Sequence, residues 1–152
     1  MRDAIPNVEI SVAGQFESIL GDEALLRQAL LNLARNAAEA ASGQPFQGRV
    51  ALHGSIEYAA GPPGGAGALQ RISIADNGSG IPPADLTKIF VPFYTTKTNG
   101  TGLGLAIVQK IVVQHGGSVE ARNQPEGGAE FIVWLPLSRL SSATVDSALA
   151  HH

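Results

Sequence analysis

The chain has 152 residues, of which 44% are hydrophobic and 15% charged, enough for one domain with a single core. Its 13 acidic and 10 basic residues give a formal net charge of -3. The sequence has no run of basic residues of the kind that binds nucleic acid. The absence of cysteine excludes disulfides and thiolate metal sites. The longest apolar run, Leu103 to Val113, is too short to cross a bilayer. We therefore expect a soluble, cytoplasmic domain, which leaves open a membrane anchor elsewhere in a parent protein.

The first half of the chain predicts a strand, a long helix and two more strands. Apolar residues alternate over Val8–Ala13, which is typical of a half-buried strand. Asp22 is placed to cap a helix over Glu23–Ala41 with an apolar stripe of leucine and alanine. Alternation then predicts two strands, and a Gly- and Pro-rich surface loop over Ala59–Ala68 separates them. These strands contain Val50, Leu52 and Ile56, and Ile72 and Ile74.

The second half begins with a long irregular segment. Asp76 to Thr101 lacks periodicity and is rich in Gly, Pro and Thr, which indicates a functional lid. Leu103–His115 then predicts a helix that is apolar on nearly every side and hence buried, with Gly116 and Gly117 ending it. Two strands close the domain, marked by Val119 and Ala121, and by Phe131, Val133 and Leu135.

This order of elements predicts the fold class. Strands, helices and strands again favour a two-layer α/β (α+β) sandwich, with one mixed sheet covered by helices on one face. We expect residues 1–137 to form the domain and residues 138–152 to form a disordered tail. Whether the terminal His151 and His152 belong to a tag is left open by the sequence.

Asn32 and Asn36 are the first candidate functional residues. Because they lie four positions apart, they share one face of the predicted helix, at the edge of its apolar stripe. An Asn amide can offer its oxygen to a hard cation such as magnesium and its nitrogen to a phosphate. The equally good alternative is two polar residues on a solvated helix face.

Asp76 is a second candidate. It shares one face of its strand with Ile72 and Ile74, so its carboxylate points toward the interior at the strand's end. A buried carboxylate needs donors, and an adenine exocyclic amine would supply one. The alternative is an Asp-Asn-Gly turn in which Asp76 binds its own backbone.

Two glycines and an isoleucine follow this acid. Gly78 and Gly80 would let the chain approach a flat ligand closely, and Ile81 offers an apolar contact for a purine face.

The segment Gly100–Leu105 runs into the predicted second helix. Glycine amides at a helix N-terminus favour an anion, which predicts a phosphate site, although a flexible hinge explains the same glycines. The lid before it contains Phe90, Phe93 and Tyr94, which would dock onto a partner or pin the loop to its own domain. Lys97 could meet a terminal phosphate.

Two isolated histidines have no visible base or nucleophile beside them. We expect His53, on a strand, and His115, at the end of a helix, to be structural rather than catalytic.

Four stretches, taken in order, resemble the N box, first glycine box, F box and second glycine box of the sensor histidine kinases. They are Asn32–Ala37, Asp76–Gly80, Ile89–Phe93 and Gly100–Leu105. The resemblance covers roughly Val8 to Pro136. Within the family, Arg35–Ala40 and Phe93–Lys97 look most like the nitrogen-regulation and oxygen-sensing branch.

The resemblance implies the Bergerat ATP-binding fold, with a mostly antiparallel sheet, and it implies ATP and Mg²⁺ as ligands. By this likeness, Asn36 would be a magnesium ligand and Asn32 a partner on the polyphosphate side, with Lys97 near the terminal phosphate. Asp76 would accept from the adenine amine. The adenine slot would be shaped by Gly78, Gly80 and Ile81, and the phosphates would be covered by Gly100, Thr101, Gly102, Leu103 and Gly104.

The same resemblance implies partners. The acceptor histidine would lie on a dimerisation domain that precedes this one and is absent from the chain, so we expect a piece of a longer kinase. Phe90 and Phe93 are the candidates for contacting that domain. A response-regulator receiver domain would be the downstream partner. The parent would be a homodimer and this piece a monomer that binds ATP but barely autophosphorylates.

Two alternatives remain and one departure is visible. Clamp-type ATPases of the superfamily carry a catalytic Glu where this chain has Asn32, which cannot take a proton at neutral pH, and Glu39 points more toward solvent. A serine kinase of the anti-sigma type is the closer alternative, although it usually lacks an element like Phe93–Lys97. Many relatives have Thr after the last glycine, where Ala129 follows Gly128 here, so that hydroxyl contact is in doubt.

Overall fold

The computed structural model describes residues 8–58, 67–92, 94 and 104–137. Five strands in this part of the chain form one sheet in the order β1-β2-β3-β5-β4. The pair β1–β2 is parallel and the other pairs are antiparallel, so the sheet is mixed and mostly antiparallel, as predicted. The strands are β1 (Val8–Gly14), β2 (Gly48–Tyr58), β3 (Ala68–Asp76), β4 (Ser118–Asn123) and β5 (Ala129–Pro136).

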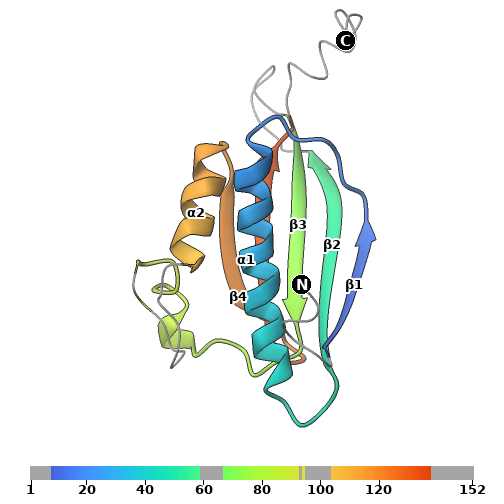
Figure 1. Cartoon of the computed structure of the whole chain (residues 1–152), viewed down its shortest axis with the longest axis vertical. Helices are drawn as coiled ribbons and strands as arrows, with labels where there is room; N and C mark the ends of the chain where they lie inside the picture. Colours follow the sequence, from blue (N-terminus) through green and yellow to red (C-terminus); the bar gives the residue numbers. More distant parts are fainter. Residues whose placement is uncertain (1–7, 59–66, 93, 95–103, 138–152) are drawn as a thin grey trace, which may run out of the picture.

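Two α-helices, α1 (Glu23–Ser42) and α2 (Gly104–Gln114), lie on the same face of this sheet (Figure 1). Helix α1 packs on β2 and β3, and α2 packs beside it on β4 and β5. A short 3-10 helix, η2 (Pro83–Asp85), is the one regular element in the described part of the segment between β3 and α2. The two-layer α/β sandwich predicted from the sequence is confirmed.

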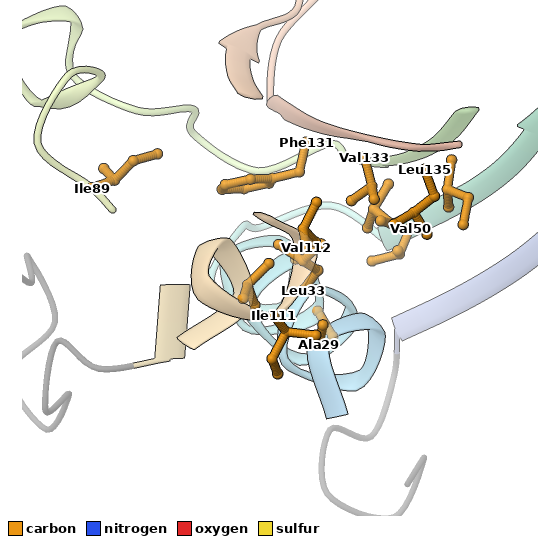
Figure 2. Packing of buried hydrophobic residues seen from close by; sticks show 14 of the residues in the cluster. Ala29, Leu33, Val50, Ile89, Ile111, Val112, Phe131, Val133 and Leu135 are labelled. Carbon is orange, nitrogen blue, oxygen red and sulfur yellow. The ribbon is translucent and has the colours of Figure 1, made fainter. Parts of the chain in front are cut away.

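The core lies between the two layers (Figure 2). Alternate strand residues, including Val50, Ile74 and Phe131, point toward the helices and are almost fully buried. On α1, Leu33 and Ala37 face them with no exposed surface. Burial of one leucine side chain contributes roughly 1.5–3 kcal/mol, and the small alanines let the helix lie close to the sheet.

Both helix ends that the sequence marked are capped as predicted. The side chain of Asp22 accepts a hydrogen bond of 3.0 Å from the Leu25 N–H at the start of α1. After α2, the N–H of Gly116 donates to Val113 and that of Gly117 donates to Val112, which is a Schellman motif. Gly116 has a φ of 82°, which this motif requires.

The expectation of a half-buried first strand was wrong for most of its residues. Ile10 is 42% and Val12 is 64% exposed, although both point to the helix-covered face. The reason is the strand's place in the sheet. β1 is an edge strand and α1 covers chiefly the next two strands, so apolar alternation did not reveal which strand lacks a helix above it.

The expectation that the second helix is buried on nearly every side was also wrong. In α2 only Val108, Ile111 and Val112 are buried, and Val113 is 58% exposed. The helix is an outer-layer element, packed on one side against α1 and the sheet, so its composition overstated its burial. Within the residues described, neither helix has both the length and the apolar character needed to traverse a bilayer.

Candidate functional site

Three elements bring candidate residues to one end of the sheet. β3 ends at Asp76, and the chain then crosses beside the last turns of α1 toward the side of the molecule on which α2 lies (Figure 1). The side-chain nitrogen of Asn32 on α1 lies 3.5 Å from the carbonyl oxygen of Gly104, the first residue of α2. The loop after β3 touches α1, because a Cβ on Gly78 would lie 2.6 Å from the Ala40 carbonyl oxygen.

Asp76 is buried, with only 3% of its surface exposed, and it lies on the helix-covered face of β3. The predicted inward orientation is therefore confirmed. Its Oδ1 accepts hydrogen bonds from the backbone N–H groups of Gly78, at 2.8 Å, and Ala129, at 3.3 Å. Burial raises the pKa of this carboxyl, and the two backbone hydrogen bonds oppose that rise.

The second oxygen of this carboxylate is different. Both hydrogen bonds of Asp76 converge on Oδ1, and no donor of the described residues reaches Oδ2. In the described part of the chain, every side-chain N or O atom that is shut off from solvent has a hydrogen-bond partner. Oδ2 has no such partner among these residues, so it is not shut off from solvent. Oδ2 is therefore open to an outside donor, while the rest of the side chain is held in place by backbone.

The two glycines after Asp76 are constrained in different ways, Gly78 by a neighbouring backbone group and Gly80 by its φ angle. Gly78 lies against the Ala40 carbonyl of α1, which leaves no room for a side chain at this position. Gly80 has a φ of 87°, a conformation that other residues rarely adopt. Ile81, the next residue, is half-buried and packs against the core. We call Gly80 and Ile81 together the Gly80–Ile81 wall.

Asn32 and Asn36 are both half-buried on α1. Asn32 makes the contact with Gly104 described above, which places it between the two helices. No side-chain hydrogen bond of Asn36 occurs among the described residues, so its amide has no competing protein partner there. Asn32 and Asn36 are thus partly shielded from solvent by the surrounding structure and do not lie on a fully exposed helix face.

The described part of the lid is pinned to the domain. The ring of Phe90 packs edge-on against Phe131, with centroids 6.3 Å apart, and Ile89 is buried beside the core. The Tyr94 hydroxyl donates to Asp85, and this hydrogen bond is the main reason why the tyrosine pKa lies above its usual value. Phe93, Lys97 and residues 100–103 lie outside the described residues.

Side-chain amides around the same loop were missed by sequence reasoning. Asn77 binds the start of β2, accepting from Arg49 N–H and donating to the Gln47 carbonyl. On the other side, Asn123 and Gln124 bind the loop from the end of β4. No sequence pattern indicates these contacts, since amides beside Gly and Pro look like ordinary turn residues.

The two isolated histidines have structural surroundings. His53 is exposed on the face of the sheet that carries no helix. His115 contacts the Ile111 carbonyl through Nδ1 and accepts from the Asp22 N–H through Nε2. Neither lies with the residues collected around Asp76.

The described part of the chain is thus a helix-backed sheet in which a buried acid ends one strand and a loop with two glycines follows it. The family described as histidine kinase-, DNA gyrase B- and HSP90-like ATPase matches residues 21–139 of this chain. The chain belongs to this family.

Individual proteins similar to the chain are sensor histidine kinases. The sensor histidine kinase ZraS of Escherichia coli K12 is 42% identical over 120 residues, covering 79% of this chain and 23% of ZraS. The mycobacterial sensor histidine kinase MprB matches 89% of the chain and 85% of its own solved chain, with 31% identity and a TM-score of 0.73. Full-length ShkA, solved in complex with AMPPNP, matches 86% of the chain and 26% of its own, with 36% identity and a TM-score of 0.66.

The chain spans about a quarter of the length of the curated relatives it matches. The predicted resemblance to sensor histidine kinases is confirmed by these matches.

Proposed function

We propose that this chain is the ATP-binding catalytic domain of a two-component sensor histidine kinase, working on the cytoplasmic side of the cell. The observation that carries the proposal is the Asp76 carboxylate, with Oδ1 held by two backbone N–H groups and Oδ2 open. An adenine exocyclic amine donates a hydrogen bond in the plane of the base, which suits one fixed, buried acceptor. The solved complex of ShkA with AMPPNP supports a nucleotide as the ligand.

Mg²⁺ fits the residues on the α1 side of this site. Among the described residues, no group of three or more acidic or histidine side chains could hold a metal by itself. Magnesium commonly binds to one or two protein oxygens together with substrate phosphates and water. Asn36, half-buried and without a described hydrogen-bond partner, would supply the protein oxygen, and the ion would neutralise phosphate charge.

The remaining roles follow from position. Asn32, tied to Gly104, would lie on the polyphosphate side and keep the start of α2 in register with α1. The N-terminus of α2 would offer backbone N–H groups to phosphate oxygens, as helix N-termini do. Gly100, Thr101, Gly102 and Leu103 would cover the phosphates, with Lys97 at the terminal one, as the resemblance implies.

Phosphate transfer to histidine is favoured over hydrolysis. The family includes gyrase B-like and HSP90-like ATPases, so membership does not separate the two chemistries. An ATPase needs a base to activate water. Asn32 cannot serve as that base, and Glu39 is exposed on α1. The anti-sigma type of serine kinase remains the second candidate, distinguished by the acid stability of its product.

The partners are a dimerisation domain bearing the histidine, and a receiver domain, in a homodimeric parent. Phe90 and Phe93 are the proposed contacts with the dimerisation domain. Phe90 already packs on Phe131, so it would present only the outer part of its ring, whereas its neighbour Val91 is 50% exposed. The signal sensed and the cognate regulator would be decided by other parts of the parent.

The proposal is tested in two steps. Calorimetry should show binding of ADP by this chain, and binding of ATP that tightens with Mg²⁺. The dimerisation domain of the parent kinase, supplied in trans with labelled ATP, should then become labelled on histidine in an acid-labile form. An acid-stable label would favour the serine kinase, and absence of any nucleotide binding would refute the proposal.

A further inference from the structure

The loop that follows Asp76 is held from outside by one asparagine. Asn123, the last residue of β4, accepts from the Ile81 N–H through Oδ1 and donates to the Ile81 carbonyl through Nδ2, both at 2.7 Å. A side-chain amide carries the same donor and acceptor as a peptide group. The Asn123 side chain therefore pairs with the backbone of Ile81 as a residue of a neighbouring strand would, although no strand is present at Ile81.

The sequence explains why a side chain is needed at this point. Ile81 is followed by Pro82 and Pro83, which have no backbone N–H and cannot extend a ladder toward β4. Asn123 points to the helix-covered face, because it pairs with Ala129 in the register that places Phe131 in the core. It therefore reaches the loop from the side on which the site lies.

The neighbouring residue holds the other end of the same loop. Gln124 donates to the backbone carbonyl of Asp76 at 2.9 Å, and its own N–H donates to the Gly128 carbonyl. The segment from Asp76 to Ile81 is thus bracketed by two consecutive amides of the β4–β5 hairpin.

There is little space between Gly80 and the Asn123 side chain. A Cβ on Gly80 would lie 2.8 Å from Asn123 Oδ1, closer than side chains tolerate. The φ of Gly80 strains any residue with a side chain, and such a side chain would also press on the Asn123 amide that reaches Ile81. The positive φ of Gly80 and the clamp on Ile81 therefore define one fixed path for the chain away from the acid.

We propose that Asn123, assisted by Gln124, is the positioning residue that sets adenine selectivity, by fixing the Gly80–Ile81 wall relative to the Asp76 carboxylate. This inference rests on the proposed function. If the Gly80–Ile81 wall can shift, a purine base would still bind beside it. The amine on the edge of adenine would then no longer be held in a fixed position relative to the Asp76 carboxylate. Loss of the clamp should therefore reduce discrimination between bases more than it reduces binding in general.

The test compares the affinities for ADP and GDP. Asn123→Asp keeps the size and the acceptor but places an oxygen against the Ile81 carbonyl. Calorimetry should show ADP binding weakened about fivefold, which corresponds to about 1 kcal/mol, with a smaller change for GDP. Asn123→Ala should behave in the same way. Glu120→Gln, on the same strand but facing away from the helices, is the matched control and should bind as the unaltered chain does.

The outcomes separate this inference from the proposed function. Failure of the unaltered chain to bind ADP would sink the proposed function itself. Normal ADP binding with an unchanged ADP-to-GDP ratio in a folded Asn123 variant would overturn only the positioning role. A urea titration of each variant shows whether it is folded. If neither variant folds, Asn123 is required for the fold alone, and the positioning role is overturned.

Discussion

Nε2 of His115, just after α2, accepts a 3.0 Å hydrogen bond from the backbone N–H of Asp22, the residue that caps α1. Nδ1 of the same ring lies 2.8 Å from the Ile111 carbonyl oxygen. Because a carbonyl only accepts and an N–H only donates, these two contacts require the donor at Nδ1 and the acceptor at Nε2. The end of α2 is thus hydrogen-bonded to the start of α1, far from the candidate site.

His115→Ala should therefore reduce stability without affecting nucleotide binding. The change leaves the Asp22 N–H without its partner and removes the ring that packs on Gly21. The expected loss is about 1–2 kcal/mol of unfolding free energy, measured by urea denaturation. Gln114→Ala, at the adjacent exposed position, should cost much less. Equal losses in the two variants would contradict this fastening role.

Gly78→Ala tests the contact between the loop and α1. The added methyl group would lie 2.6 Å from the Ala40 carbonyl oxygen and 2.8 Å from its carbon, so backbone must move. We expect destabilisation of roughly 1–3 kcal/mol, together with weaker nucleotide binding as the loop moves from Asp76. Gly104→Ala is the control for stability, because a Cβ there meets nothing within 4 Å. A neutral Gly78→Ala would show that the loop relaxes freely.

Asp76→Asn should separate stability from recognition. The pKa of Asp76 is raised by burial, so at pH values above that pKa the folded state carries the cost of a buried charge. An Asn oxygen can still accept from Gly78 and Ala129, and the cost disappears, so the unfolding free energy at neutral pH should stay the same or rise. Adenine binding should weaken at least tenfold, with preference for ATP over GTP lost, because an amide NH₂ would face the adenine amine. Unchanged preference in calorimetry would remove Asp76 from the base site.

Asn36→Ala tests the proposed metal ligand. If its oxygen holds magnesium, the variant should lose about tenfold in affinity for Mg-ATP and much less for nucleotide without metal. Gln28→Ala, exposed on the same helix, is the matched control. Calorimetry with and without Mg²⁺ distinguishes the possibilities. Equal losses in the two conditions would mean that Asn36 contacts the nucleotide itself, or only shapes the pocket.

Glu130 makes a pH-dependent contribution on the face of the sheet without helices. Burial by itself would raise its pKa, but hydrogen bonds from Ser73 and Arg122 and the charges of Arg122 and Arg71 lower it overall. A carboxyl whose pKa is lowered by folding stabilises the fold above its unfolded pKa, about 4.3, and loses that contribution as pH falls further. Unfolding free energy should therefore drop more steeply below about pH 4.5 in the unaltered chain than in Glu130→Gln. Parallel pH profiles would show that the network adds nothing.

Much of the fold could be predicted because its signals are local. Alternation in β3 and β5, the Asp22 cap and the Gly116 stop each depend on a few neighbouring residues. The orientation of Asp76 followed from the same two-residue period. Burial could not be predicted as well, since Val12 and Val113 have core-like neighbours in sequence but no element above them.

Contacts between distant parts of the chain gave no local signal. Gln70 is buried and holds the segment after β1 by accepting from Glu17 N–H and donating to the Gln15 carbonyl, yet in sequence it is one polar residue in a strand. Asn123 is likewise a single polar residue at the end of a strand. Such roles depend on which backbone groups are left unpaired, and only the complete fold shows that.

The sequence by itself determined the order of the elements, the family and the candidate residues, because periodicity, caps and spaced motifs are properties of short segments. Only the tertiary structure decided that Gly78 lies against α1, that one oxygen of Asp76 is held while the other is open, and that Asn123 binds both backbone groups of Ile81. These are matters of which groups from distant segments meet, and packing in three dimensions sets them.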